Sequence, residues 1–181
     1  MCKAEYNFKK DVISFIFANS KNQMIYSKIH IFLLTSVILT FLYSSCEKQQ
    51  QHPVPSGLAN FTINIETDPE FFLLNAIGHS MEISNTMVNT FNLGFDNNGV
   101  IVYNAGDAEF YVFDRTCPYD MPKSIAVETN TTSGIATCPE CGTEYILPSM
   151  GSPTFEGPGT WPLREYKAYF NINTGELQVY N

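Results

Sequence analysis

The stretches "RTCPYD" (Arg115–Asp120) and "ATCPECGTEY" (Ala136–Tyr145) each place a Cys-Pro step at the end of a strand-like run. The proline after each cysteine restrains the backbone and removes an N–H, which stiffens the loop. Two hairpin tips of this kind would face each other across a small site. We therefore expect Cys117 and Cys138 to converge, with Cys141 completing a Cys-x-x-Cys pair beside them.

The sequence on both sides of these loops predicts strands and turns. "NFTINIE" (60–66) alternates apolar and polar residues, as a half-buried strand does. We also expect a strand in "MVNTFNLGF" (87–95), a turn at Asn98-Gly99, and paired strand-like runs over 100–114 and 164–181. No amphipathic helical pattern of ten residues is present. The prediction is an all-β domain of roughly eight to ten short strands over residues 58–181.

The first fifty residues have a different character and predict export. Residues 24–45 run from Met24 through a basic residue and an apolar core to two small residues, which is typical of a signal peptide. The junction "LYSSC" resembles the lipobox of bacterial lipoproteins, in which Cys46 would be lipidated and become the first mature residue. Residues 46–57 then predict a flexible polar tether. Residues 1–23 precede the signal, and we interpret them as a mis-assigned start or an extension.

Charge argues against some partners. The 181-residue chain has a net charge of −8, and a chain beginning at Cys46 would hold five basic against 16 acidic residues, hence −11. No basic patch is evident, so a nucleic-acid partner is not expected. Attachment to a membrane would come from the lipid on Cys46. Motifs of hydrolytic catalysis, such as Gly-x-Ser-x-Gly or His-rich metal motifs, are missing from the sequence.

The two cysteine stretches, together with "GSPTFEGPGTWPLREY" (151–166), look like the two cluster loops and the proline-rich loop of Rieske iron–sulfur domains. The resemblance spans most of residues 100–169 and is nearest to Rieske-like lipoproteins of the Bacteroidetes type. It implies stacked antiparallel sheets with two cysteine-bearing hairpin loops. It also implies that the proline-rich loop, with Pro158, Trp161 and Pro162, forms a lid over the cysteine loops.

The ligand positions of that family are only half matched. Each loop of the family supplies one Cys and one His to a [2Fe–2S] cluster. Cys117 and Cys138 stand at the two Cys positions, whereas Tyr119 and Cys141 stand at the two His positions. The iron that would take two imidazoles has therefore lost both.

Three chemistries remain open for these residues. The first is a [2Fe–2S] cluster with Cys117 and Cys138 on one iron and Cys141 with Tyr119 on the other. The second is zinc on three thiolates, with Asp120 or a water as the fourth ligand. The third is no metal and a Cys117–Cys138 disulfide, with a local Cys138–Cys141 bridge as the competing pairing; an oxidising envelope favours a disulfide, and we prefer this reading. In that case Tyr119 would fill the space of the cluster, with its hydroxyl bonded to backbone.

These alternatives predict two functions. The preferred one is an extracytoplasmic, membrane-attached lipoprotein whose cluster-free Rieske-like domain is a structural or binding module. The alternative is one-electron transfer through a cluster with unusual ligands, to or from an unidentified protein or redox partner. An enzymatic role is not expected beyond such electron transfer.

Overall fold

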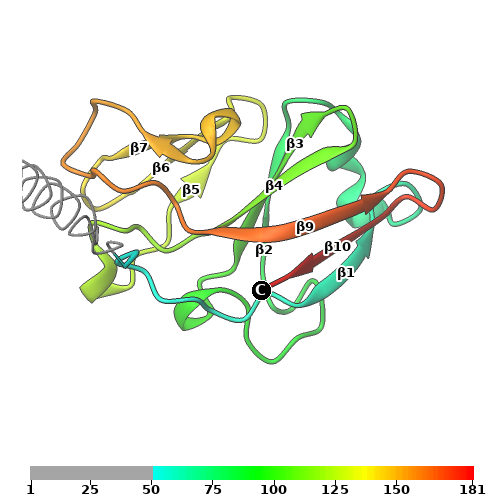
Figure 1. The fold of residues 1–181 in the computed structure, drawn as a ribbon, viewed down its shortest axis with the longest axis horizontal. Coiled ribbons are helices and arrows are strands. Elements are labelled where there is room, and N and C mark those ends of the chain that lie inside the picture. The colour runs from blue at the N-terminus through cyan, green and yellow to red at the C-terminus, as the bar shows by residue number, and fades with distance from the viewer. Residues whose placement is uncertain (1–50) are drawn as a thin grey trace, which may run out of the picture. The chain divides into compact units, whose positions relative to one another are not determined.

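The computed structural model describes residues 51–181, which form one compact unit of antiparallel strands (Figure 1). The predicted start or extension, the signal peptide, the lipidation site Cys46 and the first part of the tether lie outside the described residues. Within residues 51–181, none of the helical segments has the length and apolar character needed to cross a membrane.

Ten strands form two antiparallel sheets, which confirms the predicted all-β fold with two cysteine-bearing loops. The six-stranded sheet has the order β1-β10-β9-β4-β3-β2 and the four-stranded sheet the order β5-β6-β7-β8. The strands are β1 (Phe61–Asn64), β2 (Ser80–Ile83), β3 (Val100–Gly106), β4 (Glu109–Asp114), β5 (Glu128–Thr129), β6 (Ile135–Thr137), β7 (Glu144–Ile146), β8 (Ser152–Pro153), β9 (Glu165–Asn171) and β10 (Glu176–Tyr180).

The helical segments of the described residues are short 3-10 turns, located in the connections between strands. They are η1 (Pro69–Asn75), η2 (Phe95–Asn97), η3 (Met121–Lys123) and η4 (Leu147–Ser149). The longest of them, η1, begins at Asp68, whose side chain accepts a hydrogen bond from the Glu70 N–H.

The predicted paired runs over 100–114 and 164–181 are confirmed as the β3–β4 and β9–β10 hairpins. The strand expected over 87–95 is wrong, because this segment forms turns. Asn89 has φ 51° and Gly94 has φ 73°, and such left-handed residues interrupt an extended backbone. The Asn98-Gly99 turn leads into β3, whose partner earlier in the chain is β2, paired antiparallel with it before residues 87–95.

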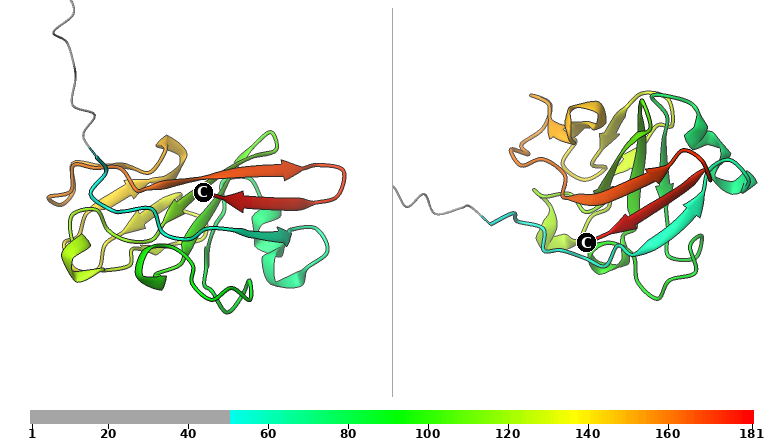
Figure 2. Two further views of the ribbon diagram at one scale, coloured as in Figure 1. Left: turned by 60° about the horizontal axis from the view of Figure 1, so that its bottom comes forward. Right: turned by 45° about the vertical axis from the view of Figure 1, so that its right-hand side comes forward.

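The β3–β4 hairpin separates two hydrophobic cores because both of its faces are covered. Val100 and Val102 of β3 belong to the core under β1, β10 and η1, whereas Ile101 and Tyr103 belong to the core beneath the four-stranded sheet. This alternation follows from the two-residue period of a strand. Figures 1 and 2 show the four-stranded sheet, in yellow and orange, beside this hairpin, with β1 and β10 on its far side. The second core also contains Cys117 and Cys138.

Residues 51–57 pack on the domain more closely than a solvated tether would. Val54 is fully buried, and its carbonyl accepts a hydrogen bond of 2.9 Å from the Arg164 guanidinium. His52, in the segment expected to be a flexible tether, is half-buried and its Nε2 lies 3.0 Å from the Pro162 carbonyl oxygen. The Gly57 N–H donates to the Tyr166 hydroxyl oxygen at 3.1 Å. The ordered domain therefore begins before Leu58.

Candidate metal centre

A fully buried carboxylate determines how the chain leaves β4 toward the first cysteine. Asp114 Oδ1 accepts the Thr116 N–H at 2.8 Å, and Oδ2 accepts the Phe95 N–H at 2.6 Å and the Tyr166 hydroxyl at 2.7 Å. Burial, reinforced by the Asp114 charge, raises the pKa of Tyr166, so this phenol stays a donor. The three donors hold the strand end in one orientation, three residues before Cys117.

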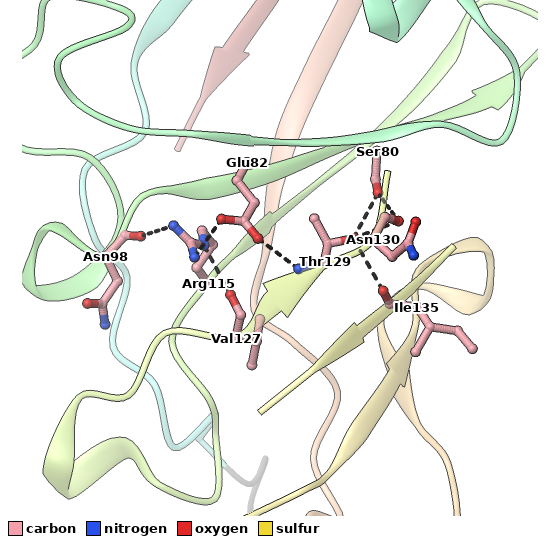
Figure 3. Close-up of polar contacts among 8 residues, drawn as sticks. All are labelled: Ser80, Glu82, Asn98, Arg115, Val127, Thr129, Asn130 and Ile135. Atoms are coloured by element: carbon pink, nitrogen blue, oxygen red, sulfur yellow. Dashed lines mark hydrogen bonds and ion pairs between the residues drawn. The ribbon is translucent and has the colours of Figure 1, made fainter. Parts of the chain in front are cut away.

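Arg115 attaches the first cysteine loop to the edge of the six-stranded sheet (Figure 3). Its guanidinium forms an ion pair of 2.7 Å with Glu82 of β2 and donates through Nε to the Val127 carbonyl at 3.1 Å. The second Glu82 oxygen accepts the Thr129 N–H of β5 at 2.7 Å. Because one side chain reaches a carboxylate and a carbonyl at once, the planar fork of arginine suits this position better than lysine would.

The first loop closes on itself so that Asp120 faces inward. The Cys117 N–H donates to the Ile125 carbonyl at 2.8 Å, and the Lys123 N–H donates to the Asp120 carbonyl at 2.9 Å. Ser124 has φ 53°, which reverses the chain after η3. Asp120 is 7% exposed, an unusual degree of burial for an acidic side chain.

The second loop is a tight knuckle between β6 and β7. The Cys138 N–H donates to the Thr143 carbonyl at 2.9 Å, and the Gly142 N–H donates to the Cys138 carbonyl at 3.0 Å. Gly142 has φ 71°, a conformation that glycine adopts without a side-chain clash. The knuckle turns Cys138 and Cys141 toward the first loop.

Together the loops assemble a thiol–carboxylate cluster, defined by Cys117, Asp120, Cys138 and Cys141. One ligand atom of each residue lies within 4.8 Å of the others. Cys117 Sγ lies 3.8 Å from Cys141 Sγ, and the Asp120 Oδ2 atom lies 3.3 Å from Cys138 Sγ and 3.9 Å from Cys117 Sγ. Three of the four side chains are buried and Cys141 is half-buried.

Hydroxyl groups surround the cluster and contact its sulfur atoms. The Tyr145 hydroxyl lies 3.2 Å from Cys117 Sγ, and the Thr143 hydroxyl lies 3.2 Å from Cys141 Sγ. Burial, followed by the Cys117 contact, raises the pKa of Tyr145, so its hydroxyl remains protonated and can donate. Burial also raises the pKa of Cys138, while backbone hydrogen bonds from Cys141 and Glu140 act in the opposite direction.

At the surface, an exposed ion pair also links the two loops. Lys123 Nζ lies 2.5 Å from Glu140 Oε1, and the hydrogen bond to Glu140 raises the pKa of Lys123. The two side chains are 60% and 50% exposed, so solvent screens this contact and it contributes little to stability.

The proline-rich loop contacts the second cysteine loop through glycines. The Gly159 N–H donates to the Thr143 hydroxyl at 3.0 Å, and a Cβ atom on Gly157 would lie 2.6 Å from the Thr143 backbone. Trp161, expected as a lid, is half-buried and packs edge-on against His52 with ring centroids 5.7 Å apart.

The other two residues of the expected lid, Pro158 and Pro162, are exposed. The hydrogen bonds recorded between the proline-rich loop and the second cysteine stretch are therefore made by backbone groups of Thr154, Glu156 and Gly159 rather than by these apolar side chains.

The expected role of Tyr119 as a space-filling aromatic is wrong, because its side chain is 54% exposed. Its neighbour Asp120 occupies the inward position, and Tyr145, which the sequence analysis did not single out, supplies the buried aromatic hydroxyl. Alternation along β7 could have indicated that Tyr145 faces inward, but not that it meets Cys117.

The three cysteines of the described residues are free thiols, so the expected Cys117–Cys138 disulfide is not formed in this structure. The 3.8 Å between Cys117 Sγ and Cys141 Sγ is well beyond the ~2.05 Å of a disulfide bond.

The donor set was tested against the two metal groups considered for it. In a tetrahedral ion with metal–sulfur bonds of ~2.3 Å, two sulfur ligands lie about 3.8 Å apart, which equals the Cys117–Cys141 separation of 3.8 Å. In a [2Fe–2S] cluster, ligands on different irons lie roughly 5 Å or more apart because the two metals separate them. The 4.8 Å limit on all donor pairs fits one ion and does not fit two irons.

Comparison with known proteins gives limited similarity. No protein-family model and no curated protein matches the chain. Among solved structures, the ferredoxin of carbazole 1,9a-dioxygenase from Nocardioides aromaticivorans IC177 matches with 18% identity and a TM-score of 0.40, over 66% of this chain and 97% of that one.

A second match is a structure described as the complex of reduced oxygenase and oxidised ferredoxin in carbazole 1,9a-dioxygenase. It has 23% identity and a TM-score of 0.39, over 57% of this chain and 82% of that one. Identity and structural similarity are low in both, so the chemistry of this chain is argued from its own residues.

Proposed function

We propose that this protein is a lipid-anchored domain of the cell envelope that has a Rieske-like architecture, carries no [2Fe–2S] cluster, and acts as a structural or binding module. The observation that carries the proposal is the donor geometry of the thiol–carboxylate cluster. Its ligand atoms lie within 4.8 Å of one another, too close to be shared between two irons.

Two replacements in the loops support the absence of a cluster. Tyr119 and Cys141 stand where the resemblance calls for the two histidines. Tyr119 is 54% exposed, whereas Cys141 lies 3.8 Å from the sulfur of Cys117. Neither residue can then hold a second iron at the distance that a two-iron cluster requires. The same argument weighs against the alternative of one-electron transfer through such a cluster.

The site instead serves to tie the two loops together. Cys117 follows β4 of the six-stranded sheet, whereas Cys138 and Cys141 lie between β6 and β7 of the four-stranded sheet. Their convergence buries Cys117 and Cys138 in the second core. A link at this point stiffens the domain at the junction of its two sheets, as a scaffold or binding module needs.

The cluster content tests this function directly. The full-length protein is purified anoxically from native membranes, and its iron, acid-labile sulfide and visible absorption are measured. We expect no sulfide and no visible chromophore. About two irons with two sulfides in the wild-type protein would overturn the proposal.

Anchoring is tested separately. The proposal expects Cys46 to carry the lipid, because the lipobox-like junction ends there and the −11 charge of the remaining chain gives no electrostatic attraction to anionic membranes. Labelling cells with a radioactive fatty acid should mark the wild-type protein and not Cys46→Ser. Equal labelling of both proteins would contradict the assignment of Cys46.

A further inference from the structure

We infer that the thiol–carboxylate cluster binds a single Zn²⁺ ion, which joins the two cysteine loops in place of a disulfide or an iron–sulfur cluster. The inference rests on the proposed function in one respect, since both require that no [2Fe–2S] cluster is present. The inference adds that the link between the loops is Zn²⁺ and that Asp120 is its fourth ligand.

The distances of the cluster match the edges of one tetrahedron. Zinc–sulfur bonds of ~2.3 Å and zinc–oxygen bonds of ~2.1 Å at tetrahedral angles give sulfur–sulfur edges of about 3.8 Å and sulfur–oxygen edges of about 3.6 Å. The Cys117–Cys141 pair lies 3.8 Å apart, and the two distances from Asp120 Oδ2 to sulfur, 3.3 and 3.9 Å, bracket the expected edge. Three of the six edges are therefore met to within a few tenths of an ångström, and no pair of donor atoms in the cluster is more than 4.8 Å apart.

The chemistry of the donors selects zinc among common ions. Three thiolates disfavour Mg²⁺ and Ca²⁺, which take oxygen ligands. Thiolate sites with tetrahedral geometry are typical of zinc, and zinc binds more tightly than ferrous iron to a given set of ligands. Asp120 is 7% exposed and faces two sulfur atoms, a position that an ionised carboxylate occupies at a high desolvation cost unless a cation compensates it.

The surroundings of the cluster suit bound thiolates. A thiolate that binds a metal keeps lone pairs, and hydrogen bonds to them orient the ligand and spread its charge. The Tyr145 hydroxyl at 3.2 Å from Cys117 and the Thr143 hydroxyl at 3.2 Å from Cys141 can supply these hydrogen bonds. The Thr143 hydroxyl also accepts a hydrogen bond from the Gly159 N–H, so the proline-rich loop orients the hydroxyl that contacts Cys141.

A zinc ion here would be structural. Four protein ligands leave no open position for water or substrate, and a closed site of this kind contributes folding energy rather than catalysis. Binding converts three thiols to thiolates and releases their three protons to solvent. Zinc affinity should therefore fall steeply as the pH is lowered.

Metal analysis of the full-length protein tests the inference. The protein is purified without chelator, its zinc and iron are measured by mass spectrometry of the elements, and its free thiols are counted by alkylation under non-reducing conditions. We expect about one zinc per chain and no disulfide among Cys117, Cys138 and Cys141. The Co²⁺-substituted protein should show the intense visible bands of tetrahedral cobalt with thiolate-to-metal charge transfer.

Two carboxylate-to-amide variants separate a ligand from a neighbour. Asp120→Asn removes the fourth ligand at constant volume and should weaken zinc binding by about 100-fold or more, measured by competition with a chromophoric chelator. Glu140→Gln is the matched control, since this carboxylate lies in the second loop but is exposed, and its zinc affinity should equal that of the wild type. Because the cobalt spectrum is recorded on the wild type, a misfolded variant does not remove the test.

The outcomes distinguish the two proposals. A metal-free protein with a disulfide between the loops overturns the zinc inference and leaves the proposed function intact. Two irons with two sulfides overturn both. One iron without sulfide overturns the assignment to zinc, and equal zinc affinity of Asp120→Asn and the wild type overturns the role of Asp120.

Discussion

Replacing Asp114 by asparagine should strongly destabilise the domain, because this carboxylate is fully buried and accepts three hydrogen bonds. Asn has the same shape but offers one acceptor oxygen and one NH₂ group. If the NH₂ replaces Oδ1 it faces the Thr116 N–H, and if it replaces Oδ2 it faces the Phe95 N–H and the Tyr166 hydroxyl. At least one buried backbone donor therefore loses its acceptor in either orientation.

The magnitude follows from the hydrogen bonds lost. A buried donor left without a partner costs about 1–3 kcal/mol, and the remaining hydrogen bonds lose the assistance of the negative charge, at about 1 kcal/mol in total. We expect the free energy of unfolding to fall by about 3 kcal/mol. For a domain of this length, that corresponds to a decrease in Tm of about 10 °C.

Equilibrium urea unfolding, followed by the fluorescence of the single tryptophan, measures this change. Asp96→Asn is the control, because Asp96 is exposed and asparagine tolerates its left-handed backbone, φ 49°. Tyr166→Phe should cost less in the Asp114→Asn background than alone, since the two share a 2.7 Å hydrogen bond. An Asp114→Asn protein within about 1 kcal/mol of the wild type would refute the reasoning.

Three further predictions concern the surroundings of the site and the exposed face of the six-stranded sheet. Tyr145→Phe removes the hydroxyl that contacts the first-loop thiol and should lower the free energy of unfolding by about 1 kcal/mol in chemical denaturation; an unchanged value would show that the contact is not stabilising. Gly157→Ala and Gly142→Ala both place alanine at positive φ, but only the Cβ at position 157 would clash with backbone, 2.6 Å from Thr143. Gly157→Ala should therefore lower Tm more than Gly142→Ala does, and the reverse order would contradict the predicted clash. Burial, and then the charge of Glu109, raises the pKa of Glu165 above the ordinary value of 4.5. Ionisation of Glu165 therefore lowers the stability of the folded protein as the pH rises above 4.5. Glu165→Gln should therefore raise Tm at pH 7 by an amount that corresponds to less than about 1 kcal/mol, and leave it unchanged at pH 3 in calorimetry; a lower Tm at pH 7 would reverse the sign of the argument.

Local patterns in the sequence predicted two of the hairpins but not every strand, since β2 was not foreseen. The β3–β4 hairpin was predicted from β-rich runs joined by a turn and the β9–β10 hairpin from apolar–polar alternation, signals that act over a few neighbouring positions. The same rules failed over residues 87–95, where an apolar run resembles a strand but left-handed residues bend the chain. Whether such a run extends or turns depends on the partner strand available to it, which alternation does not reveal.

The cysteine site shows the same division at the level of single side chains. The two Cys-Pro loops led us to predict that Cys117, Cys138 and Cys141 would meet, and they do so although the loops leave different sheets. Only the tertiary structure shows that Asp120, and not Tyr119, is the buried residue of the first loop. The Cys117–Ile125 and Lys123–Asp120 backbone hydrogen bonds close this loop with Asp120 inside.

Tyr145 reaches the site only because the four-stranded sheet packs on β3 and β4, a contact between residues far apart in the chain. Patterns of residue type specify which segments are strands and where cysteines lie, since these depend on local backbone preference. The direction of a side chain in a loop, and the group that it meets across two sheets, depend on long-range packing and hydrogen bonding. Those interactions determine whether the same sulfur atoms surround two irons, one ion or none.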